Sequence, residues 1–511
     1  FYQNDESGVS DYPLPDYSVR PAASKTIKYP MAGDKSEKIR VGIWNAQTAS
    51  TVFLKFDSNA DDFYATNLTW NPEGTKVLIQ WLNRATNWMK MMLFDASSGN
   101  MEKVLFEEKD ERWVEPLFPA YFLPNNSTLF VHISNRDGFN NLYVYDLSGN
   151  LLRKSKATFE ITEFLGFDKK GDNAFVMATG EFPTEELCYR ISMEDMVLNK
   201  VTTPHGVHDC KIAASGNYVL DRYNSLADPG KVDLLGKDGI TQKNLLTPEN
   251  PALSKKMGKA EIFAIPLKDD TDGWCRVIKP SDFDPSKKYP VLVYVYGGPH
   301  AQMITNSFWG GASLWMYQLA EEGYIIFTLD NRGSSHRGKK FQQVIHRNLG
   351  SNEMADQLKG VEWLKSQPWV DASRVAVHGW SFGGFMTTTL MLKSPGTFKV
   401  GVAGGPVIDW SMYEVMYGER YMDTPAENPE GYKNSDLTNY VDKLEGKLLM
   451  IHGVEDDVVV MQHNLKFLKA AVDNGKQVDF FAYPGHAHNV AGKDRLHLMT
   501  KVIDYIKTNL K

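Results

Sequence analysis

The first half of the chain alternates short apolar runs with turn residues. Strand-like runs end in Asp or Asn followed by small residues, as in VGIWNAQTAS, MMLFDASSGN and LYVYDLSGN, and more weakly in CYRISMEDM and KVDLLGKDG. Aligned on Asn45, Asp95, Asp146, Ser192 and Gly236, these five copies are 44 to 51 residues apart. This period is typical of four-stranded propeller blades, which bury their faces against their neighbours.

We therefore predict an all-β propeller domain over residues 1–247, the alternative being a β-sandwich with coincidental spacing. Propellers usually close with more than five blades, and the chain starts at Phe1 without a signal-like segment. We accordingly expect the propeller to be partial, truncated at its N-terminal side. The segment TPENPALSKK is the predicted linker to the second half.

From about residue 260, apolar strands alternate with amphipathic helices. The candidate strands are EIFAIPL, WCRVIKP, VLVYVYG, IIFTLDN, VAVHGW, VGVAGG, LLMIHG and VDFFAYP, and helical patterns include EMADQLKGVEWLKSQ and HNLKFLKAAVDNG. Continuous Val, Ile and Leu strands separated by helices indicate a mostly parallel, doubly wound sheet covered on both faces. Ligands of such sheets bind beyond the carboxyl ends of the strands.

Composition and charge narrow the function classes. The chain has 511 residues and a net charge of −7, which argues against a nucleic-acid partner and against a polybasic membrane ligand. No apolar run approaches the length of a transmembrane segment. The three cysteines, Cys188, Cys210 and Cys275, include no C-x-x-C pair and fit neither a disulfide scaffold nor a zinc site.

One strand end carries a nucleophile motif. Gly379-Trp380-Ser381-Phe382-Gly383 fits G-x-S-x-G between a predicted strand and a predicted helix. Such a serine must project from a tight turn, and flanking glycines leave room for the adjacent backbone. The N–H that follows the serine points toward the place where an oxyanion would form. The alternative is an ordinary tight turn.

Two later strand ends supply partners for this serine. A serine hydroxyl needs a histidine base held by a carboxylate, and in this fold class they follow in the order serine, acid, histidine. The strand KLLMIHG leads to Asp456 and Asp457, and the last strand leads to His486 and His488. Spacing alone leaves both pairs of alternatives open.

Several motifs together resemble the prolyl oligopeptidase clan of serine peptidases, in its dipeptidyl peptidase IV subfamily. They are GWSFGGF, YVYGGPHAQ, DNRGSSHRG, WSMYEVMYGERYM, IHGVEDDVV and the Tyr-x4-His spacing of YPGHAH. The chain is most similar to bacterial prolyl tripeptidyl aminopeptidases, and the resemblance covers essentially its whole length. It implies an α/β-hydrolase peptidase domain over residues 248–511, preceded by the propeller.

The resemblance also implies roles for catalytic residues. Matched position by position, it makes Ser381 the nucleophile, Asp456 the orienting acid and His488 the general base. Tyr296 falls where the family places an oxyanion-hole hydroxyl, beside the N–H of Phe382. A tyrosine that only packs is the alternative at position 296. The family implies neither a metal nor a cofactor.

A proline pocket is implied as well. Trp410, Tyr413 and Tyr417 have spacings of three and four residues, which on a helix would place them on one face. An aromatic stripe is more often core than pocket, but the resemblance makes these three, with Val407 and Val459, a flat S1 pocket for a proline ring.

The chain departs from the subfamily at three positions. Phe382 replaces a tyrosine, which leaves the backbone N–H unchanged, and Val458 replaces an asparagine that binds a substrate carbonyl. Glu414 replaces a shorter aspartate, and its carboxylate could bind the α-ammonium of a peptide. A structural salt bridge from Glu414 to an arginine such as Arg420 is the alternative.

The expected function is that of a serine exopeptidase that cuts after proline near a free amino terminus. Loss of the asparagine and presence of Glu414 favour X-X-Pro tripeptides over X-Pro dipeptides as products. In the subfamily a glutamate pair that binds the amino terminus lies just upstream of the segment matching FYQNDES. The rival functions are an endopeptidase or esterase, and a non-catalytic propeller protein that binds partners.

The resemblance finally suggests surroundings for the protein. Its partners would be peptides with a free N-terminus and proline at the cut. Relatives commonly pair through the hydrolase domain and a propeller arm, so we expect a homodimer. They act outside the cytoplasm, which favours the periplasm or the cell surface of a bacterium.

Overall fold

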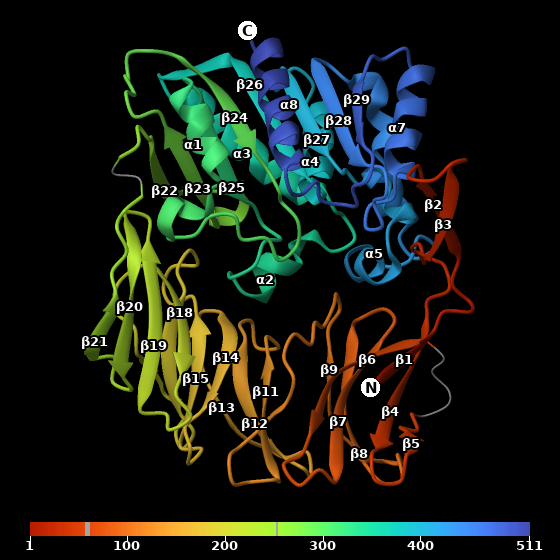
Figure 1. The fold of residues 1–511 in the computed structure, drawn as a ribbon, viewed down its shortest axis with the longest axis vertical. Coiled ribbons are helices and arrows are strands. Elements are labelled where there is room, and N and C mark those ends of the chain that lie inside the picture. The colour runs from red at the N-terminus through yellow and green to blue at the C-terminus, as the bar shows by residue number, and fades with distance from the viewer. Residues whose placement is uncertain (57–61, 252–253) are drawn as a thin grey trace.

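The computed structural model describes residues 1–56, 62–251 and 254–511. Small antiparallel sheets come first along the chain, and one large helix-covered sheet follows. Figure 1 shows the two groups stacked, with the small sheets below and the large sheet above.

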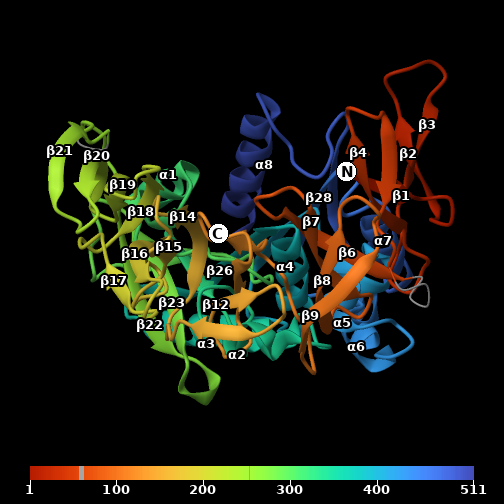
Figure 2. The same cartoon turned by 90° about the horizontal axis from the view of Figure 1, so that it is seen from below.

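The small sheets are antiparallel and follow one another along an arc, which is visible from below in Figure 2. Within the described residues the orders are β1-β4-β5, β6-β7-β8-β9, β10-β11-β12-β13, β14-β15-β16-β17 and β18-β19-β20-β21. The bounds are β1 Tyr2–Asp5, β4 Lys38–Asn45, β5 Ser50–Phe53, β6 Phe63–Trp70, β7 Lys76–Asn83, β8 Trp88–Asp95, β9 Met101–Lys109, β10 Tyr121–Phe122, β11 Leu129–Ser134, β12 Asn141–Asp146, β13 Leu151–Lys154, β14 Ile161–Phe167, β15 Asn173–Ala178, β16 Leu187–Ser192, β17 Leu198–Lys200, β18 Val207–Ile212, β19 Tyr218–Ser225, β20 Asp228–Gly236 and β21 Thr241–Leu246.

The sequence repeat coincides with one position in every sheet. Its five anchor residues are the last residues of β4, β8, β12, β16 and β20, the strand next to the end of each sheet. The reason is a turn: Asp95 Oδ1 accepts the N–H groups of Ser97 and Ser98, and Asn45 Oδ1 accepts that of Gln47. The repeated unit is therefore a propeller blade, as predicted, and the β-sandwich alternative is wrong.

Apolar clusters join neighbouring blades. Leu78 and Met91 of one sheet pack with Phe130 and Tyr143 of the next, and all four are nearly inaccessible to water. Two of the cysteines lie in a similar cluster, and all three are buried and unpaired among the described residues. Burial of these faces, at about 25 cal/mol per Å² of apolar surface, holds blade to blade.

The large sheet contains every strand predicted for the second half. Its order is β22-β23-β25-β24-β26-β27-β28-β29 within the described residues; the β22–β23 and β23–β25 pairs are antiparallel and the other pairs are parallel. The strands are β22 Lys259–Pro266, β23 Asp272–Lys279, β24 Tyr289–Tyr294, β25 Ile325–Asp330, β26 Val370–Trp380, β27 Val400–Gly404, β28 Lys447–Gly453 and β29 Asp479–Tyr483.

Helices cover both faces of this sheet, as in an α/β hydrolase. They are α1 Leu314–Glu321, α2 Lys339–Gln342, α3 Ser351–Ser366, α4 Phe382–Lys393, α5 Val415–Met422, α6 Pro429–Ser435, α7 Gln462–Asp473 and α8 Asp494–Asn509. One apolar cluster packs α1 and α8 on one face, and another packs α3, α4 and α7 on the opposite face. Strand residues buried from both sides explain the continuous apolar runs in the sequence.

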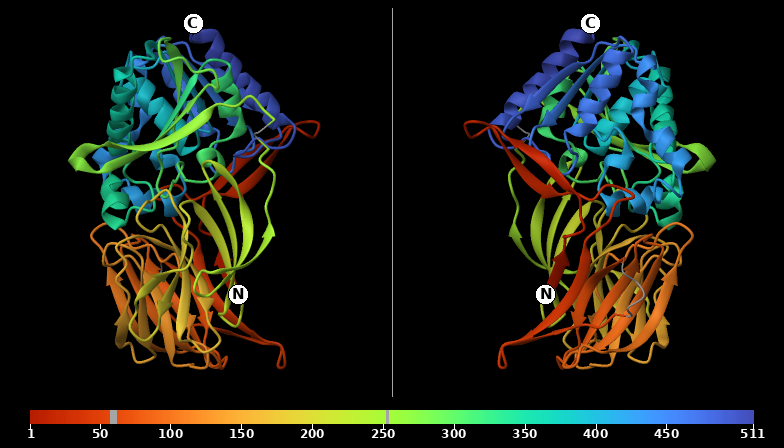
Figure 3. Two further views of the ribbon diagram at one scale, coloured as in Figure 1. Left: turned by 90° about the vertical axis from the view of Figure 1, so that its left-hand side faces the viewer. Right: turned by 90° about the vertical axis from the view of Figure 1, so that its right-hand side faces the viewer.

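A hairpin leaves the propeller and reaches the large sheet. Among the described residues, strands β2 (Asp11–Asp16) and β3 (Ala23–Lys28) pair only with each other. Figures 1 and 3 show this red hairpin beside the blue helices, and α7 is its neighbour in Figure 1. The repeat in the sequence did not indicate this hairpin, because the hairpin lies before Asn45, the first anchor residue of the pattern.

None of the helices in the described part of the chain combines the length and the hydropathy that a membrane crossing requires. The proposed boundary between residues 247 and 248 lies between β21 and β22. It stays a prediction, as does the linker, two residues of which (252 and 253) lie outside the described residues.

Candidate active site

Ser381 lies at a strained corner between β26 and α4. Its φ is +61°, in the left-handed region that a residue with a Cβ rarely adopts. The surrounding glycines are required by contact: a Cβ at Gly379 or Gly383 would lie 2.2 or 2.3 Å from the carbonyl oxygen of Val295. The glycines of the motif therefore let two backbone segments approach the serine turn.

The oxyanion candidates lie beside this turn. Phe382 is the first residue of α4, whose N-terminal dipole favours negative charge. Tyr296 follows β24, the neighbour of β26 in the sheet, and its Cα lies next to Gly383. The rings of Tyr296 and Phe382 are 6.2 Å apart, and burial raises the pKa of the Tyr296 hydroxyl, which keeps it protonated as a donor.

The acid and the histidine are connected directly. Asp456 is fully buried, and its Oδ2 is 2.8 Å from His488 Nδ1. Its Oδ1 accepts the backbone N–H groups of Val458 and Val459, at 2.9 and 2.8 Å. Burial alone would raise the pKa of Asp456, but hydrogen bonds from His452 and His488 outweigh it and hold the pKa at about 2.

The structure distinguishes the alternatives that spacing left open for the acid and for the histidine. Asp457 is exposed, whereas Asp456 faces the histidine. His486 Nε2 is 3.0 Å from Asp494 Oδ2, so that its ring is engaged at the surface. Of the four candidates, Asp456 and His488 are the acid and the histidine that contact each other within the described residues.

His488 lies at the edge of the serine turn. A Cβ at Gly405 would be 3.2 Å from the His488 ring, and the His488 carbonyl accepts the indole N–H of Trp380 at 3.0 Å. Ser381 N–H in turn donates to the carbonyl of Gly404. Among the described residues the ring bonds to Asp456 and not to the Ser381 hydroxyl, and catalytic hydrogen bonds are often long until substrate is bound.

An aromatic cluster adjoins the serine. Trp410 stacks on Tyr417 with ring centroids 5.9 Å apart, and Tyr413 meets both rings edge-on at 5.2 and 5.3 Å. Trp410 also contacts Phe382, 5.5 Å away. Val407 and Val459 belong to the same apolar cluster and are almost completely buried. Tyr413 and Tyr417 are partly exposed, so they are the accessible part of the group.

These aromatics do not share one helix face, which is a correction. Trp410 is in a short 3₁₀ turn (Trp410–Met412), Tyr413 is extended, and Tyr417 is in α5. The break arises because Asp409 and Glu414 each accept backbone N–H groups and start new turns. The rings meet through the fold of the loop and not through helical spacing.

Glu414 has a structural partner that the sequence did not suggest. Its carboxylate caps α5 by accepting the N–H groups of Met416 and Tyr417, both at 3.0 Å. Arg420, the alternative partner, instead donates to Glu115 Oε1 at 2.8 Å. Burial raises the pKa of Glu414. Its binding of a substrate ammonium stays a prediction.

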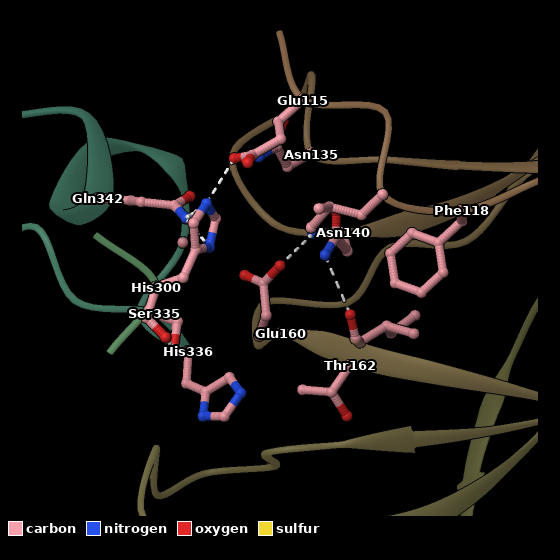
Figure 4. A pocket seen from close by; sticks show the side chains of 13 residues that line it. Glu115, Phe118, Asn135, Asn140, Glu160, Thr162, His300, Ser335, His336 and Gln342 are labelled. Carbon is pink, nitrogen blue, oxygen red and sulfur yellow. Dashed lines mark hydrogen bonds and ion pairs between the residues drawn. The ribbon is translucent and has the colours of Figure 1, made fainter. Parts of the chain in front are cut away.

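A cavity of about 210 Å³ is lined by residues from both groups of sheets (Figure 4). His300, four residues after Tyr296, binds Glu115 of the propeller half through Nε2 at 2.6 Å. On the opposite wall Glu160 accepts the N–H of Asn140. Burial raises the pKa of Glu160 to about 7, so the cavity wall holds a carboxyl that is half protonated near neutral pH.

Two residues that support the acid loop, His452 and Tyr29, were not identified from the sequence. His452 lies in an apolar strand, a context that favours a core residue, yet its Nε2 is 3.2 Å from Asp456 Oδ2. Tyr29 donates to the carbonyl of Val458 at 2.7 Å from more than four hundred residues away. No sequence signal identifies such long-range pairs; for His452, its place four residues before Asp456 was the only local indication.

Comparison with known proteins agrees with this arrangement. Residues 1–230 match the dipeptidyl peptidase IV (DPP IV) N-terminal region, and residues 311–511 match the prolyl oligopeptidase family. Proteins named probable dipeptidyl-aminopeptidase B from Aspergillus oryzae and Aspergillus flavus are each 30% identical over 96% of the chain. The chain spans 58% and 57% of their respective lengths.

Solved structures are similar over the whole chain. A Bacteroides ovatus protein assigned as a dipeptidyl aminopeptidase IV has a TM-score of 0.96 and 42% identity, and the match covers 100% of this chain and 75% of that one. Dipeptidyl peptidase 4 of Porphyromonas gingivalis has a TM-score of 0.92 and 28% identity, with 100% and 72% covered. The chain therefore belongs to the prolyl oligopeptidase family of serine peptidases, in the branch with a dipeptidyl peptidase IV N-terminal region.

Proposed function

We propose that this protein is a serine exopeptidase that cleaves after proline near the free amino terminus of peptides and releases X-X-Pro tripeptides. The observation that carries the proposal is the buried Asp456–His488 contact at the edge of the Ser381 turn, next to a cluster of flat aromatic rings. Family membership supports peptide hydrolysis. The main alternative is release of X-Pro dipeptides, which the relatives' names favour equally.

The residues suggest an acyl-enzyme mechanism. His488 Nε2 accepts the Ser381 hydroxyl proton as the serine oxygen attacks the prolyl carbonyl carbon. Negative charge on the carbonyl oxygen is stabilised by the Tyr296 hydroxyl and the Phe382 N–H. His488 then returns the proton to the leaving amine as the C–N bond breaks. Water, deprotonated by His488, attacks the ester carbonyl carbon; the bond to the Ser381 oxygen breaks, His488 returns the proton to that oxygen, and the peptide acid is released.

The same residues suggest the specificity. A pyrrolidine ring is rigid and flat-sided, and it would pack against the accessible parts of Tyr413 and Tyr417, whose rings are supported by Trp410. Val458 is 41% exposed at this place and offers no side-chain hydrogen bond to a substrate carbonyl. Fewer contacts to a dipeptide, together with the longer acid at Glu414, favour a product one residue longer.

Chromogenic peptides test the proposal. We expect the purified protein to hydrolyse Ala-Ala-Pro-p-nitroanilide faster than Ala-Pro-p-nitroanilide, and Ser381→Ala to lower kcat/KM by about 10⁴-fold or more. The masses of products from one proline-containing peptide identify the released length. Hydrolysis retained by Ser381→Ala would refute the mechanism, and release of dipeptides alone would establish the alternative.

N-acetylated peptides separate the rival enzymes. An exopeptidase that anchors an α-ammonium should reject acetyl-Ala-Ala-Pro-p-nitroanilide, whereas an endopeptidase or esterase should accept it. A protein that binds ligands without catalysis would release no p-nitroaniline from any of these substrates. Homodimerisation and a location in the periplasm or at the cell surface belong to the same proposal, supported by the family resemblance.

A further inference from the structure

A strap from the propeller half crosses the pocket wall. We define it as residues 29–34, which follow the β2–β3 hairpin. The Val415 N–H donates to the carbonyl of Pro30 at 2.9 Å, and the Ala32 N–H donates to that of Tyr413 at 3.0 Å. Met31 and Glu414 form an antiparallel bridge between these bonds. The strap is therefore paired, like a short strand, with the segment that carries the pocket aromatics.

The first strap residue reaches the acid-bearing loop. Tyr29 is 5% exposed, and its hydroxyl donates to the carbonyl oxygen of Val458 at 2.7 Å. Burial raises the pKa of this hydroxyl far above neutral pH, so the hydroxyl stays protonated and can donate a hydrogen bond. The hairpin that precedes Tyr29 lies beside α7 in Figure 1.

One peptide unit connects this contact to the acid. The Val458 carbonyl and the Val459 N–H belong to the same planar amide, and that N–H donates to Asp456 Oδ1 at 2.8 Å. A donor on the carbonyl fixes the plane and polarises the amide, which strengthens the bond that its N–H makes. The path from hydroxyl to carboxylate thus contains two hydrogen bonds and one rigid group.

The same loop also contacts His452 of β28. Its Nε2 contacts the Val459 carbonyl at 2.6 Å and Asp456 Oδ2 at 3.2 Å, while its Nδ1 has no partner among the described residues. The proton is therefore on Nε2. The titratable groups that face Asp456 are His452, His463, His488, Tyr29 and Tyr413.

We infer that Tyr29 is a positioning residue for catalysis: by holding the Val458–Val459 peptide, it fixes the hydrogen bonding of Asp456 and so sets the basicity of His488. The inference rests on the proposed function for its kinetic consequence. Through Tyr29 the propeller half would influence the reactivity of His488, in addition to its position next to the site.

Removal of the Tyr29 hydroxyl should change the pH dependence of activity in a defined direction. In Tyr29→Phe the Val458–Val459 amide group is no longer held in one orientation. The hydrogen bond from the Val459 N–H to Asp456 therefore weakens. A carboxylate with a weaker donor attracts the His488 imidazolium more strongly, so the ring stays protonated to a higher pH. We expect the acid limb of the kcat/KM profile to move up by roughly half a pH unit, and kcat/KM at its plateau to fall several-fold.

Tyr12→Phe is the matched control. Tyr12 lies on β2 with its ring 5.9 Å from that of Tyr29, and its hydroxyl contacts the backbone of Gln462 instead of the acid loop. Both variants lose one interdomain hydroxyl, so both should lower the unfolding midpoint slightly. Only Tyr29→Phe should shift the acid limb. An unshifted limb, or equal shifts in the two variants, would overturn the inference.

A second measurement separates this inference from the proposed function. Histidine labelled with ¹³C at Cε1 reports the titration of His488, assigned by the signal missing in His488→Gln. A higher pKa of His488 in Tyr29→Phe supports the inference even if the wild-type protein hydrolyses no prolyl peptide, a result that would refute only the proposed function. Identical titrations in wild type and Tyr29→Phe would refute the inference whatever the activity.

Discussion

At the scale of single residues, Asp456 is a charged carboxylate that is completely buried. The carboxylate receives two backbone N–H groups and two histidine contacts, and these lower its pKa to about 2 despite burial. Because the folded pKa is below the ordinary value, this charge stabilises the fold above about pH 4. That stabilisation is lost as the pH falls through about 2.

Replacement of this acid should abolish most of the activity. Asp456→Asn keeps the shape but presents no negative charge to His488, so the ring loses its orientation and its stabilised imidazolium. We expect kcat to fall by about 10³–10⁴-fold in the Ala-Ala-Pro-p-nitroanilide assay. The neighbouring Asp457→Asn is the control and should retain nearly full kcat, since Asp457 is exposed. A large loss in the control with activity kept in Asp456→Asn would reverse the assignment.

At the scale of elements, the junction of β26 and α4 depends on close backbone approach. Ser381 stands between the end of β26 and the start of α4 with a φ of +61°, a strained backbone conformation. A side chain at Gly383 would meet the carbonyl of Val295, and one at Gly384 would lie 2.5 Å from that of Gly404. The local sequence thus determines where the nucleophile stands.

Gly383→Ala should disrupt this junction. The added methyl must displace backbone atoms of the segment that leads to Tyr296, so the oxyanion side of the site should shift. We expect kcat/KM to fall by at least about 100-fold, because small displacements of catalytic groups are costly. Gly8→Ala is the control, since its Cβ would come no closer than 4.0 Å to another residue. Full activity in Gly383→Ala would contradict the packing argument.

At the scale of the whole molecule, buried ion pairs connect the two groups of sheets. Arg84 of the propeller half forms a two-point contact with Glu419 of α5, at 2.7 Å from Nε and 2.7 Å from Nη2. Glu419 is 2% exposed and also accepts the N–H of Gly33 in the strap. Helix α5, which carries Tyr417, is therefore connected to the propeller half by an ion pair that is largely shielded from solvent.

Arg84→Met should weaken this connection strongly. It leaves the Glu419 carboxylate buried without its cation, and loss of one partner of a buried pair costs about 3–5 kcal/mol. Urea titration followed by tryptophan fluorescence measures the change. The control is Arg222→Met, whose pair with Asp209 is more than half exposed on both sides and should contribute less than about 1 kcal/mol. Equal effects of the two variants would argue against a special role for the buried pair.

Local patterns predicted much of this molecule. The turn residues at Asn45, Asp95 and Asp146 marked the blades because each forms its bonds within a few residues of itself. The strands of the large sheet were visible for a similar reason, since burial on both faces demands unbroken apolar runs. The serine motif could be identified because its geometry depends on adjacent glycines.

Patterns along the chain could not give contacts between distant segments. The helical spacing of Trp410, Tyr413 and Tyr417 suggested one face, but side-chain caps divided the segment into separate turns. The β2–β3 hairpin and the bond from Tyr29 to Val458 leave no periodic trace, because only two segments far apart in sequence define them.

The sequence by itself determined which elements form, where the nucleophile turn lies and which side chains are candidates for the acid and the base, since these depend on interactions between near neighbours. Tertiary structure alone decided that Asp456 and His488 meet, that the aromatic rings converge, and that the propeller half holds the acid loop and α5. Those contacts depend on the relative placement of sheets, which is set by the packing of the entire core.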